Sequence, residues 1–286
     1  MTADRCLLFV GAHPDDESFG PGGTLAKYAQ QGVKVYYACG TRGEVGEASA
    51  EHLAGHASTG EMRSTELACA AEALGLAGVI YLGYRDSGMT GSPNNAAAGA
   101  LAAAPLDEVT GRIVKVLRDI RPQVVLTFDP IGGYRHPDHI AIHNATVKAF
   151  QAAADAAQYP AAGPAYQPQK LYYAVFPKTL LRAAVRVLPL FGRDPRRFGT
   201  NHDVDLVSLT NVDFPVHARI HIPAEAARAR AAASACHRSQ LPGMPSDRGP
   251  MGIVMRVMGR EEGFMRAQPP APGGRLRETD FFEGLV

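Results

Sequence analysis

The sequence lacks the features that would assign the protein to a membrane, a nucleic acid or a cysteine-ligated metal. No run of eighteen apolar residues occurs in its 286 residues, so no segment has the length and hydrophobicity of a spanning helix. The formal net charge of +1 gives no electrostatic reason to expect nucleic acid or an anionic membrane as a partner. The four cysteines form no CxxC pair, which argues against a cysteine-zinc site.

The cysteines and the N-terminus both bear on location. Cys6, Cys39, Cys69 and Cys236 are widely spaced and lie in apolar or helical contexts, so we expect reduced, mostly buried thiols. The chain runs from Met1 directly into a predicted strand, without the long apolar stretch and cleavage site of a secretory signal. Together these observations predict a cytoplasmic protein.

The common nucleotide and serine-nucleophile motifs are also missing. The sequence contains no P-loop and no GxSxG elbow. Residues 40–46 (GTRGEVG) are rich in glycine and follow a predicted strand, but their spacing is not that of a GxGxxG dinucleotide fingerprint. We interpret this segment as a loop that lines a pocket, with Glu44 as a polar contact.

The first half of the chain alternates apolar runs with amphipathic stretches. This βαβα order is typical of a doubly wound, mostly parallel, Rossmann-like sheet flanked by helices, and we therefore expect an α/β fold. The expected strands are 6–10, 33–39, 79–82 and 124–128, and the expected helices are 23–31, 60–74, 106–120 and 137–157.

After residue 157 the pattern loosens into a C-terminal extension. We expect strands at 171–176 and 216–222, a helix at 223–237, and loops with little regular structure from Leu241 onward. Residues 1–160 are predicted to form the α/β core that carries the site. Residues 161–286 are predicted to complete the same single domain and the substrate pocket. Whether 178–213 forms a lid or surface padding stays open.

The segment His13-Pro14-Asp15-Asp16-Glu17 places an imidazole and three carboxylates directly after the first predicted strand. Ligands of open α/β sheets bind at the carboxyl ends of strands. A divalent metal would explain this cluster, with His13 and Asp16 as ligands and Asp15 free to act on a water molecule. The alternative is that the acidic residues only charge the first turn of a helix.

A second cluster, His136-Pro137-Asp138-His139, follows the predicted strand 124–128. If both strands are parallel in one sheet, the two clusters meet at the same edge, which favours a metal site. The expected ligands are His13, Asp16 and one histidine of this cluster. The four-residue spacing of His139 and His143 would also allow that pair to share a metal.

The remaining groups of this cluster suggest catalytic roles. His136 could stabilise an oxyanion as a cation, and Asp138 could hold it in place and raise its pKa. Tyr134, which follows two glycines, could add a hydrogen bond.

These motifs resemble those of the PIG-L/LmbE-like deacetylases. The AHPDDE motif lies at 12–17, the HPDH motif at 136–139, and residues 83–89 (GYRDSGM) are similar to a sugar-contacting loop of the mycothiol-pathway members. The similarity runs from the first strand to about His143, with a weaker match at 237–240 (HRSQ).

The resemblance implies a zinc hydrolase that removes acetyl from an N-acetylglucosamine unit. It implies His13, Asp16 and His139 as zinc ligands, although a His₂Asp set also suits Fe²⁺. It implies Asp15 as general base and His136, oriented by Asp138, as an aid to the oxyanion. Residues implied to contact the intermediate or the sugar, or to lie near the site, are Tyr134, Arg63, Asp86, His237 and Gln240.

Two other functions fit the same motifs. An amidase could cleave a larger acyl group from a glucosamine conjugate, and a non-catalytic relative could bind a sugar only. In each case the expected partner is a small amino-sugar compound rather than a nucleic acid or a membrane. The aglycone, and whether the protein is a monomer or a homo-oligomer, stay open.

Overall fold

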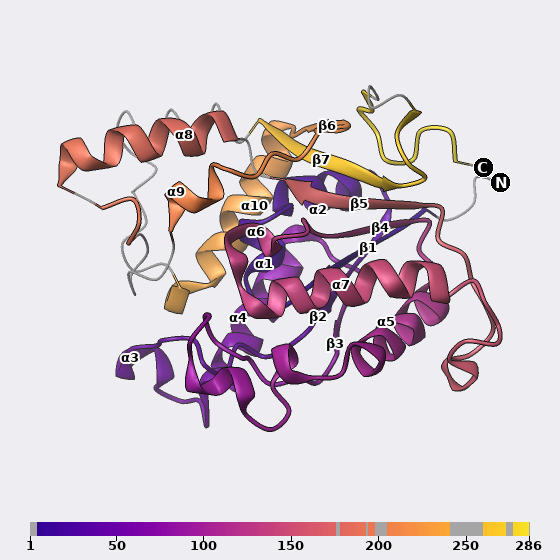
Figure 1. Ribbon diagram of the computed structural model, residues 1–286, viewed down its shortest axis with the longest axis horizontal. Coiled ribbons are helices and arrows are strands. Elements are labelled where there is room, and N and C mark those ends of the chain that lie inside the picture. Colours follow the sequence, from indigo (N-terminus) through magenta and orange to yellow (C-terminus); the bar gives the residue numbers. More distant parts are fainter. Residues whose placement is uncertain are drawn as a thin grey trace.

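The computed structural model describes residues 5–175, 178–192, 194–197, 205–240, 260–272 and 277–285. In these ranges the chain forms a seven-stranded sheet of order β3-β2-β1-β4-β5-β7-β6 (Figure 1). Strands β1 to β5 are parallel, and β7 is antiparallel to both β5 and β6. The strands are β1 (Cys6–Gly11), β2 (Lys34–Cys39), β3 (Gly78–Tyr81), β4 (Val124–Phe128), β5 (Lys170–Val175), β6 (Ala218–His221) and β7 (Glu261–Gln268).

Helices cover both faces of this sheet, with α5 and α7 on one face and α2, α4 and α10 on the other (Figure 1). The long helices are α2 (Gly22–Gln30), α4 (Thr59–Leu74), α5 (Leu106–Ile120), α7 (Pro137–Ala152), α8 (Lys178–Val187) and α10 (Ala224–Cys236). The short ones are α1 (Asp16–Phe19), α3 (Ala50–Leu53), α6 (Gly132–Arg135) and α9 (Leu206–Leu209). Single turns of 3₁₀ helix are η1 (Pro93–Ala96), η2 (Leu101–Ala103), η3 (Pro160–Ala162), η4 (Leu188–Phe191) and η5 (Arg238–Gln240).

Strand β1 shows why the sequence of a central strand is continuously apolar. Leu7 and Phe9 belong to the hydrophobic core under α2, α4 and α10, whereas Leu8 and Val10 belong to the core under α5 and α7. All four side chains are fully buried, because a parallel strand between two helical layers has no face in contact with water.

The strand order reverses direction between β1 and β4. From β1 the chain builds outward through β2 and β3, and from β4 it builds in the opposite direction through β5. Such a point of reversal, at the carboxyl ends of the strands, is where open α/β sheets bind their ligands. The two predicted histidine–carboxylate clusters follow β1 and β4 in the chain, so both lie at this point of reversal.

The expected α/β class and mostly parallel sheet are confirmed, and the expected strands lie within two residues of the observed ones. The expectation of loops from Leu241 onward is wrong for β7, which pairs between β5 and β6. The sequence of β7, EEGFMRAQ, has no clear alternation, so only its pairing with β5 and β6 specifies a strand there. Residues 241–259 lie outside the described ranges.

The expectation of four reduced cysteines is wrong for one pair. Cys69 on α4 and Cys236 at the end of α10 form a disulfide with a Cα–Cα distance of 5.8 Å. They are 167 residues apart, and the packing of α10 against α4 brings them together. Cys6 and Cys39 are buried free thiols, as expected. The predicted cytoplasmic location therefore loses the support that it drew from reduced cysteines. Within the described ranges, no helix combines the length and apolar character needed to cross a membrane.

Candidate metal centre

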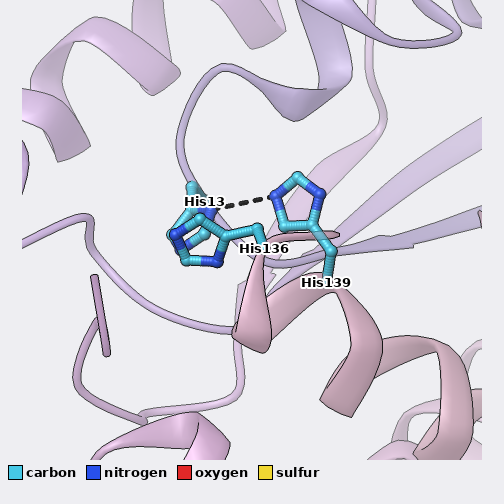
Figure 2. Close-up of side chains that lie close together, drawn as sticks. All are labelled: His13, His136 and His139. Atoms are coloured by element: carbon cyan, nitrogen blue, oxygen red, sulfur yellow. Dashed lines mark hydrogen bonds between the residues drawn. The ribbon is translucent and has the colours of Figure 1, made fainter. Parts of the chain in front are cut away.

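Three histidines meet beyond the carboxyl ends of β1 and β4 (Figure 2). His13 lies in the loop after β1, His136 is the N-cap of α7, and His139 lies in the first turn of α7. His13 Nδ1 is 3.2 Å from His139 Nε2, and the ring centroids of His13 and His136 are 4.6 Å apart. All three side chains are buried. The structure therefore brings together the two clusters that the parallel sheet was expected to unite.

Asp16 joins the histidines through its two carboxylate oxygens. Oδ2 accepts the backbone N–H groups of Ala12 (2.9 Å) and His13 (2.7 Å), which fixes the loop after β1. Oδ1 lies 3.3 Å from His139 Nε2. One oxygen therefore shapes the loop, and the other stands beside the histidine pair.

These donors fit a divalent metal ion. Bonds of about 2.0–2.1 Å in tetrahedral geometry place neighbouring ligand atoms roughly 3.3 Å apart. The observed separations are 3.2 Å for His13 Nδ1 to His139 Nε2 and 3.3 Å for His139 Nε2 to Asp16 Oδ1. The histidines His13, His136 and His139 form a group in which one ring nitrogen from each lies within 4.8 Å of the others. Asp16 lies outside this group, and its nearest approach to His13 Nδ1 is 3.9 Å, through Oδ2.

His143, the alternative partner of His139, lies outside the metal-binding clusters found among the described residues. Its Nδ1 donates to the Phe128 carbonyl at 2.8 Å, and its ring packs edge-on against Tyr173. Phe128 also stacks on the His139 ring, with centroids 3.9 Å apart. His143 therefore supports the end of β4 rather than the metal cluster.

Two carboxylates face the far side of the His13 ring. Asp138 Oδ2 lies 3.1 Å from His13 Nε2, and Asp86 Oδ1 lies 3.5 Å from the same nitrogen. Asp138 Oδ2 also accepts the Ser87 backbone N–H at 3.0 Å. A carboxylate behind a histidine fixes the proton on that outer nitrogen and directs the lone pair of the inner nitrogen inward.

This arrangement corrects the expected pairing of Asp138 with His136. The carboxylate of Asp138 bonds His13, and only its backbone N–H reaches His136, donating to Nδ1 at 3.2 Å. Burial, with the neighbouring His13 and His139, lowers the pKa of His136 to about 2 instead of raising it. As the N-cap of α7, the His136 ring also supplies Nδ1 as a hydrogen-bond acceptor to the first turn of the helix. His136 is therefore neutral, with its proton on Nε2.

Asp15 occupies a strained backbone position at the mouth of the site. Its φ of +127° lies outside the conformations that side chains other than glycine commonly adopt. Its Oδ2 accepts a hydrogen bond from Arg63 Nη2 at 2.9 Å. Burial raises the pKa of Asp15 to about 7, against the opposing effect of the Arg63 guanidinium.

Three residues expected to contact the substrate engage protein atoms here. Arg63 is buried and donates to the Pro14 carbonyl as well as to Asp15. Asp86 is also buried, and its Oδ1 accepts the Gly88 backbone N–H at 2.8 Å. Glu44 Oε2 accepts the backbone N–H of Asp86 at 3.0 Å, which ties the loop after β2 to the loop after β3.

The other two expected contacts differ in exposure. Tyr134 is 37% exposed, and its ring centroid lies 5.0 Å from that of His139. It sits on α6, where Gly132 has φ +64° and a Cβ would lie 2.8 Å from His139 Cβ, so only glycine fits. Gln240 is partly buried, and its Nε2 donates to the Glu47 carbonyl at 3.3 Å. Tyr134 is thus at the site, while Gln240 contacts the loop near Glu47.

Sequence reasoning assigned no role to Glu17, and only an uncertain one to His237. Glu17 Oε1 and His237 Nε2 lie 2.7 Å apart, and both side chains are fully buried. A carboxylate at a helix start is ordinarily solvated, so the motif gave no sign of burial. The partner lies 220 residues further along the chain, where no local pattern could indicate it.

Comparison with known proteins adds to this geometry. The profile of the family described as "PIG-L: GlcNAc-PI de-N-acetylase" matches residues 8–150. A Thermobispora bispora protein named 1D-myo-inositol 2-acetamido-2-deoxy-alpha-D-glucopyranoside deacetylase is 37% identical over 310 residues, covering 99% of each chain. A Geodermatophilus obscurus protein of the same name is 40% identical over 270 residues, covering 91% of this chain and 90% of the relative.

The fold also has a counterpart among solved structures. The N,N'-diacetylchitobiose deacetylase from Pyrococcus horikoshii, in complex with an inhibitor, superposes with a TM-score of 0.61. It is 20% identical, and the superposition covers 92% of this chain and 83% of that one. At this identity the likeness supports the fold alone.

Proposed function

Since this chain belongs to the PIG-L family of de-N-acetylases, we propose that it removes the N-acetyl group from 1D-myo-inositol 2-acetamido-2-deoxy-α-D-glucopyranoside. The products would be acetate and the free amino sugar. The observation that carries this substrate is the nearly full-length similarity to relatives named for it, joined to a buried cluster of His and Asp side chains. The family that the motifs predicted is thus confirmed.

We assign His13 Nδ1, His139 Nε2 and Asp16 Oδ1 as the metal ligands. Zinc suits this nitrogen and oxygen set, and Fe²⁺ suits it as well. A bound Zn²⁺ would lower the pKa of a water molecule and polarise the acetyl carbonyl. The carboxylates of Asp138 and Asp86 would keep His13 in the tautomer that ligation requires.

Asp15 would act as the general base. A carboxyl group with a pKa of about 7 can accept the proton of the attacking water and release it again near neutral pH. Arg63 holds Oδ2 of this carboxyl from the side of α4, so its direction is fixed before the substrate arrives. The same carboxyl can then deliver the proton to the departing amine.

His136 and Tyr134 would stabilise the oxyanion that forms on the acetyl carbonyl. His136 would act as a neutral N–H donor through Nε2, because its Nδ1 already accepts a backbone hydrogen bond. Tyr134 is exposed at the mouth of the site and would add its hydroxyl group. A well-placed donor of this kind contributes roughly 3–4 kcal/mol to the transition state.

Amine release from matched substrates tests this proposal. The purified protein would be given the inositol glycoside with an N-acetyl group, the same glycoside with a bulky N-acyl group, and methyl N-acetylglucosaminide. We expect the N-acetyl inositol glycoside to have the highest kcat/KM. Faster amine release from the bulky N-acyl compound would show that the protein is an amidase for larger acyl groups and not a deacetylase. Binding without any release, in protein that holds metal, would leave only a sugar-binding role.

A further inference from the structure

Asp15 is held from two directions by parts of the chain that are far apart in the sequence. Arg63 on α4 contacts its carboxylate, and Glu17 contacts its backbone N–H. Glu17 in turn contacts His237, the residue after α10. We call Arg63, Glu17 and His237, with the Cys69–Cys236 disulfide, the Asp15 clamp.

Glu17 uses both carboxylate oxygens in this clamp. Oε2 accepts the Asp15 backbone N–H at 2.9 Å, and Oε1 lies 2.7 Å from His237 Nε2 and 2.5 Å from Ser18 Oγ. Glu17 and His237 are both fully buried. Because a buried ionisable pair adds little net stability compared with apolar side chains of the same size, a positional role explains this pair better than a stabilising one.

The backbone of Asp15 has a specific need for such support. Its φ of +127° and ψ of −23° are strained for a residue with a side chain. Such strain persists only where surrounding contacts enforce it. The hydrogen bond from its N–H to Glu17 is a contact of that kind, and it sets the direction in which the carboxylate leaves the loop.

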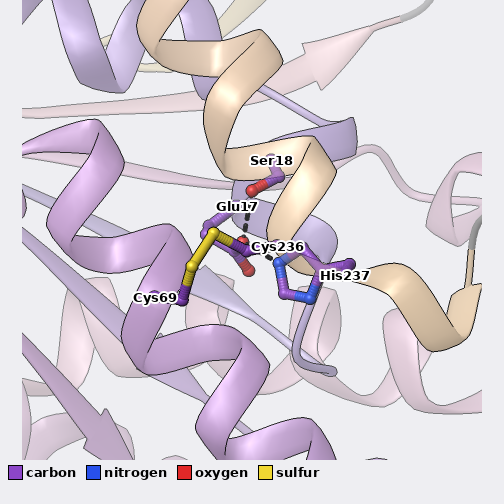
Figure 3. Close-up of a disulfide and its surroundings, with 5 residues drawn as sticks. All are labelled: Glu17, Ser18, Cys69, Cys236 and His237. Atoms are coloured by element: carbon purple, nitrogen blue, oxygen red, sulfur yellow. Dashed lines mark hydrogen bonds and ion pairs between the residues drawn. A yellow bond between two sulfur atoms is a disulfide. The ribbon is translucent and has the colours of Figure 1, made fainter. Parts of the chain in front are cut away.

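The disulfide joins the two sides of the clamp (Figure 3). Cys236 directly precedes His237, and Cys69 lies on α4, the helix that also carries Arg63. The backbone N–H and hydroxyl of Ser239 bond Glu66 on α4 at 2.8 and 2.7 Å, so the segment after α10 is anchored there twice. The helix that carries Arg63 is therefore covalently linked to the residue directly before His237, the partner of Glu17.

We propose that Glu17 and His237 are positioning residues for Asp15, and that the Cys69–Cys236 disulfide holds His237 in place beside Glu17. The inference rests on the proposed role of Asp15 as general base. It makes turnover sensitive to a dithiol such as dithiothreitol. In that reaction the dithiol is oxidised to its cyclic disulfide, and Cys69 and Cys236 each take up one electron and one proton.

Substitution of His237 tests the pair. In His237→Ala we expect kcat to fall by about 10–100-fold, with KM and metal content unchanged, because a small displacement of the base slows the chemical step. His237→Gln should recover part of this loss, since its amide N–H can still donate to Glu17. His221→Ala, at an exposed histidine of β6, is the matched control and should keep the wild-type kcat.

Reduction tests the disulfide. Treatment with dithiothreitol, with free thiols counted by mass spectrometry and metal content measured afterwards, should lower kcat at constant metal. The double variant Cys69→Ser/Cys236→Ser should show the same lower kcat and no further response to the dithiol. Cys6→Ser, at a buried free thiol, should respond like the wild type.

Hydrogen exchange gives a readout that is independent of turnover. The Asp15 amide should exchange faster in His237→Ala and in reduced protein, whereas amides of β1 should not change. If the Asp15 amide exchanges faster in these proteins but the wild type has no deacetylase activity, the clamp is retained and the proposed function is rejected. An active wild type with the same kcat and the same Asp15 exchange in His237→Ala would overturn the clamp. The clamp would also be overturned if His237→Ala lost stability and His237→Gln did not restore it.

Discussion

The environment of Asp15 is suited to proton transfer. Burial raises its pKa to about 7, and Arg63 holds one oxygen of its carboxylate. The groups assigned to the metal, His13, Asp16 and His139, lie beside it without using its side chain as a donor. Metal binding and proton transfer are therefore assigned to different residues, and substitution can separate them.

Substitution of Asp15 by asparagine should remove the base and spare the metal. The amide has the same shape but cannot accept the proton, so kcat should fall by about 10²–10⁴-fold. Metal content, measured on the same preparation, should equal that of the wild type. Asp119→Asn, on the exposed face of α5, is the control. Near-normal turnover in Asp15→Asn would show that another group is the base.

His143 should make stability depend on pH. Burial lowers the pKa of His143 below its ordinary value of 6.5, so the ring stays neutral in the fold while the unfolded chain takes up a proton. The stabilisation is present above pH 6.5 and is lost as the pH falls from there toward the lower, folded pKa.

Urea unfolding of metal-free protein would measure this effect. Between about pH 7.5 and about 5.5, wild type should lose up to ~1.4 kcal/mol more than His143→Gln, whose amide can still donate to the Phe128 carbonyl. Equal losses in the two proteins would mean that His143 titrates normally in the fold.

At the scale of elements, the loop between β4 and α7 determines where His139 and Tyr134 lie. Asp129 Oδ1 accepts the backbone N–H groups of Ile131 and Gly133, which turns the chain directly after the strand. Gly132 packs against the first turn of α7, closely enough that a Cβ would lie 2.9 Å from the Ile140 nitrogen. The turn therefore controls the position of a metal ligand through backbone packing.

Gly132→Ala tests that control. The substitution adds strain at φ +64° and a collision with His139, so we expect a stability loss of about 2–4 kcal/mol together with weaker metal binding. Gly32→Ala is the matched control, because Gly32 also has positive φ (+81°) but no atom within 4 Å of its would-be Cβ. It should lose only about 1 kcal/mol and keep its metal. Equal metal affinity in the two variants would contradict the role of the turn.

The elements that sequence predicted well are those whose pattern is local. Strands β1 and β4 are continuous apolar runs, and α5 shows helical periodicity and is followed by Pro122. Strand β7 and the disulfide could not be predicted in this way, because pairing with β5 and β6 and the packing of α10 on α4 specify them. The prediction that Asp138 pairs with His136 was also wrong, since backbone geometry at the start of α7 directs the Asp138 carboxylate to His13.

At the scale of the whole molecule, the site follows from the order of the strands. Placing β1 beside β4 brings together residues that are more than 120 positions apart, such as His13 and His139. Sequence could anticipate this convergence because parallel strands share an edge. It could not give the contacts of Arg63, Asp86 and Glu44, which depend on how three loops fold over that edge. The predicted division at residue 160 stays a prediction.

The most direct test of the metal-dependent deacetylase is amine release from the N-acetyl inositol glycoside by one preparation in three states. Release would be measured as purified, after the metal has been removed by a chelator, and after zinc has been added back. We expect release to disappear with the metal and to return in proportion to the zinc bound. Undiminished release from protein shown to be free of metal would contradict the assignment of His13, Asp16 and His139 to an essential metal.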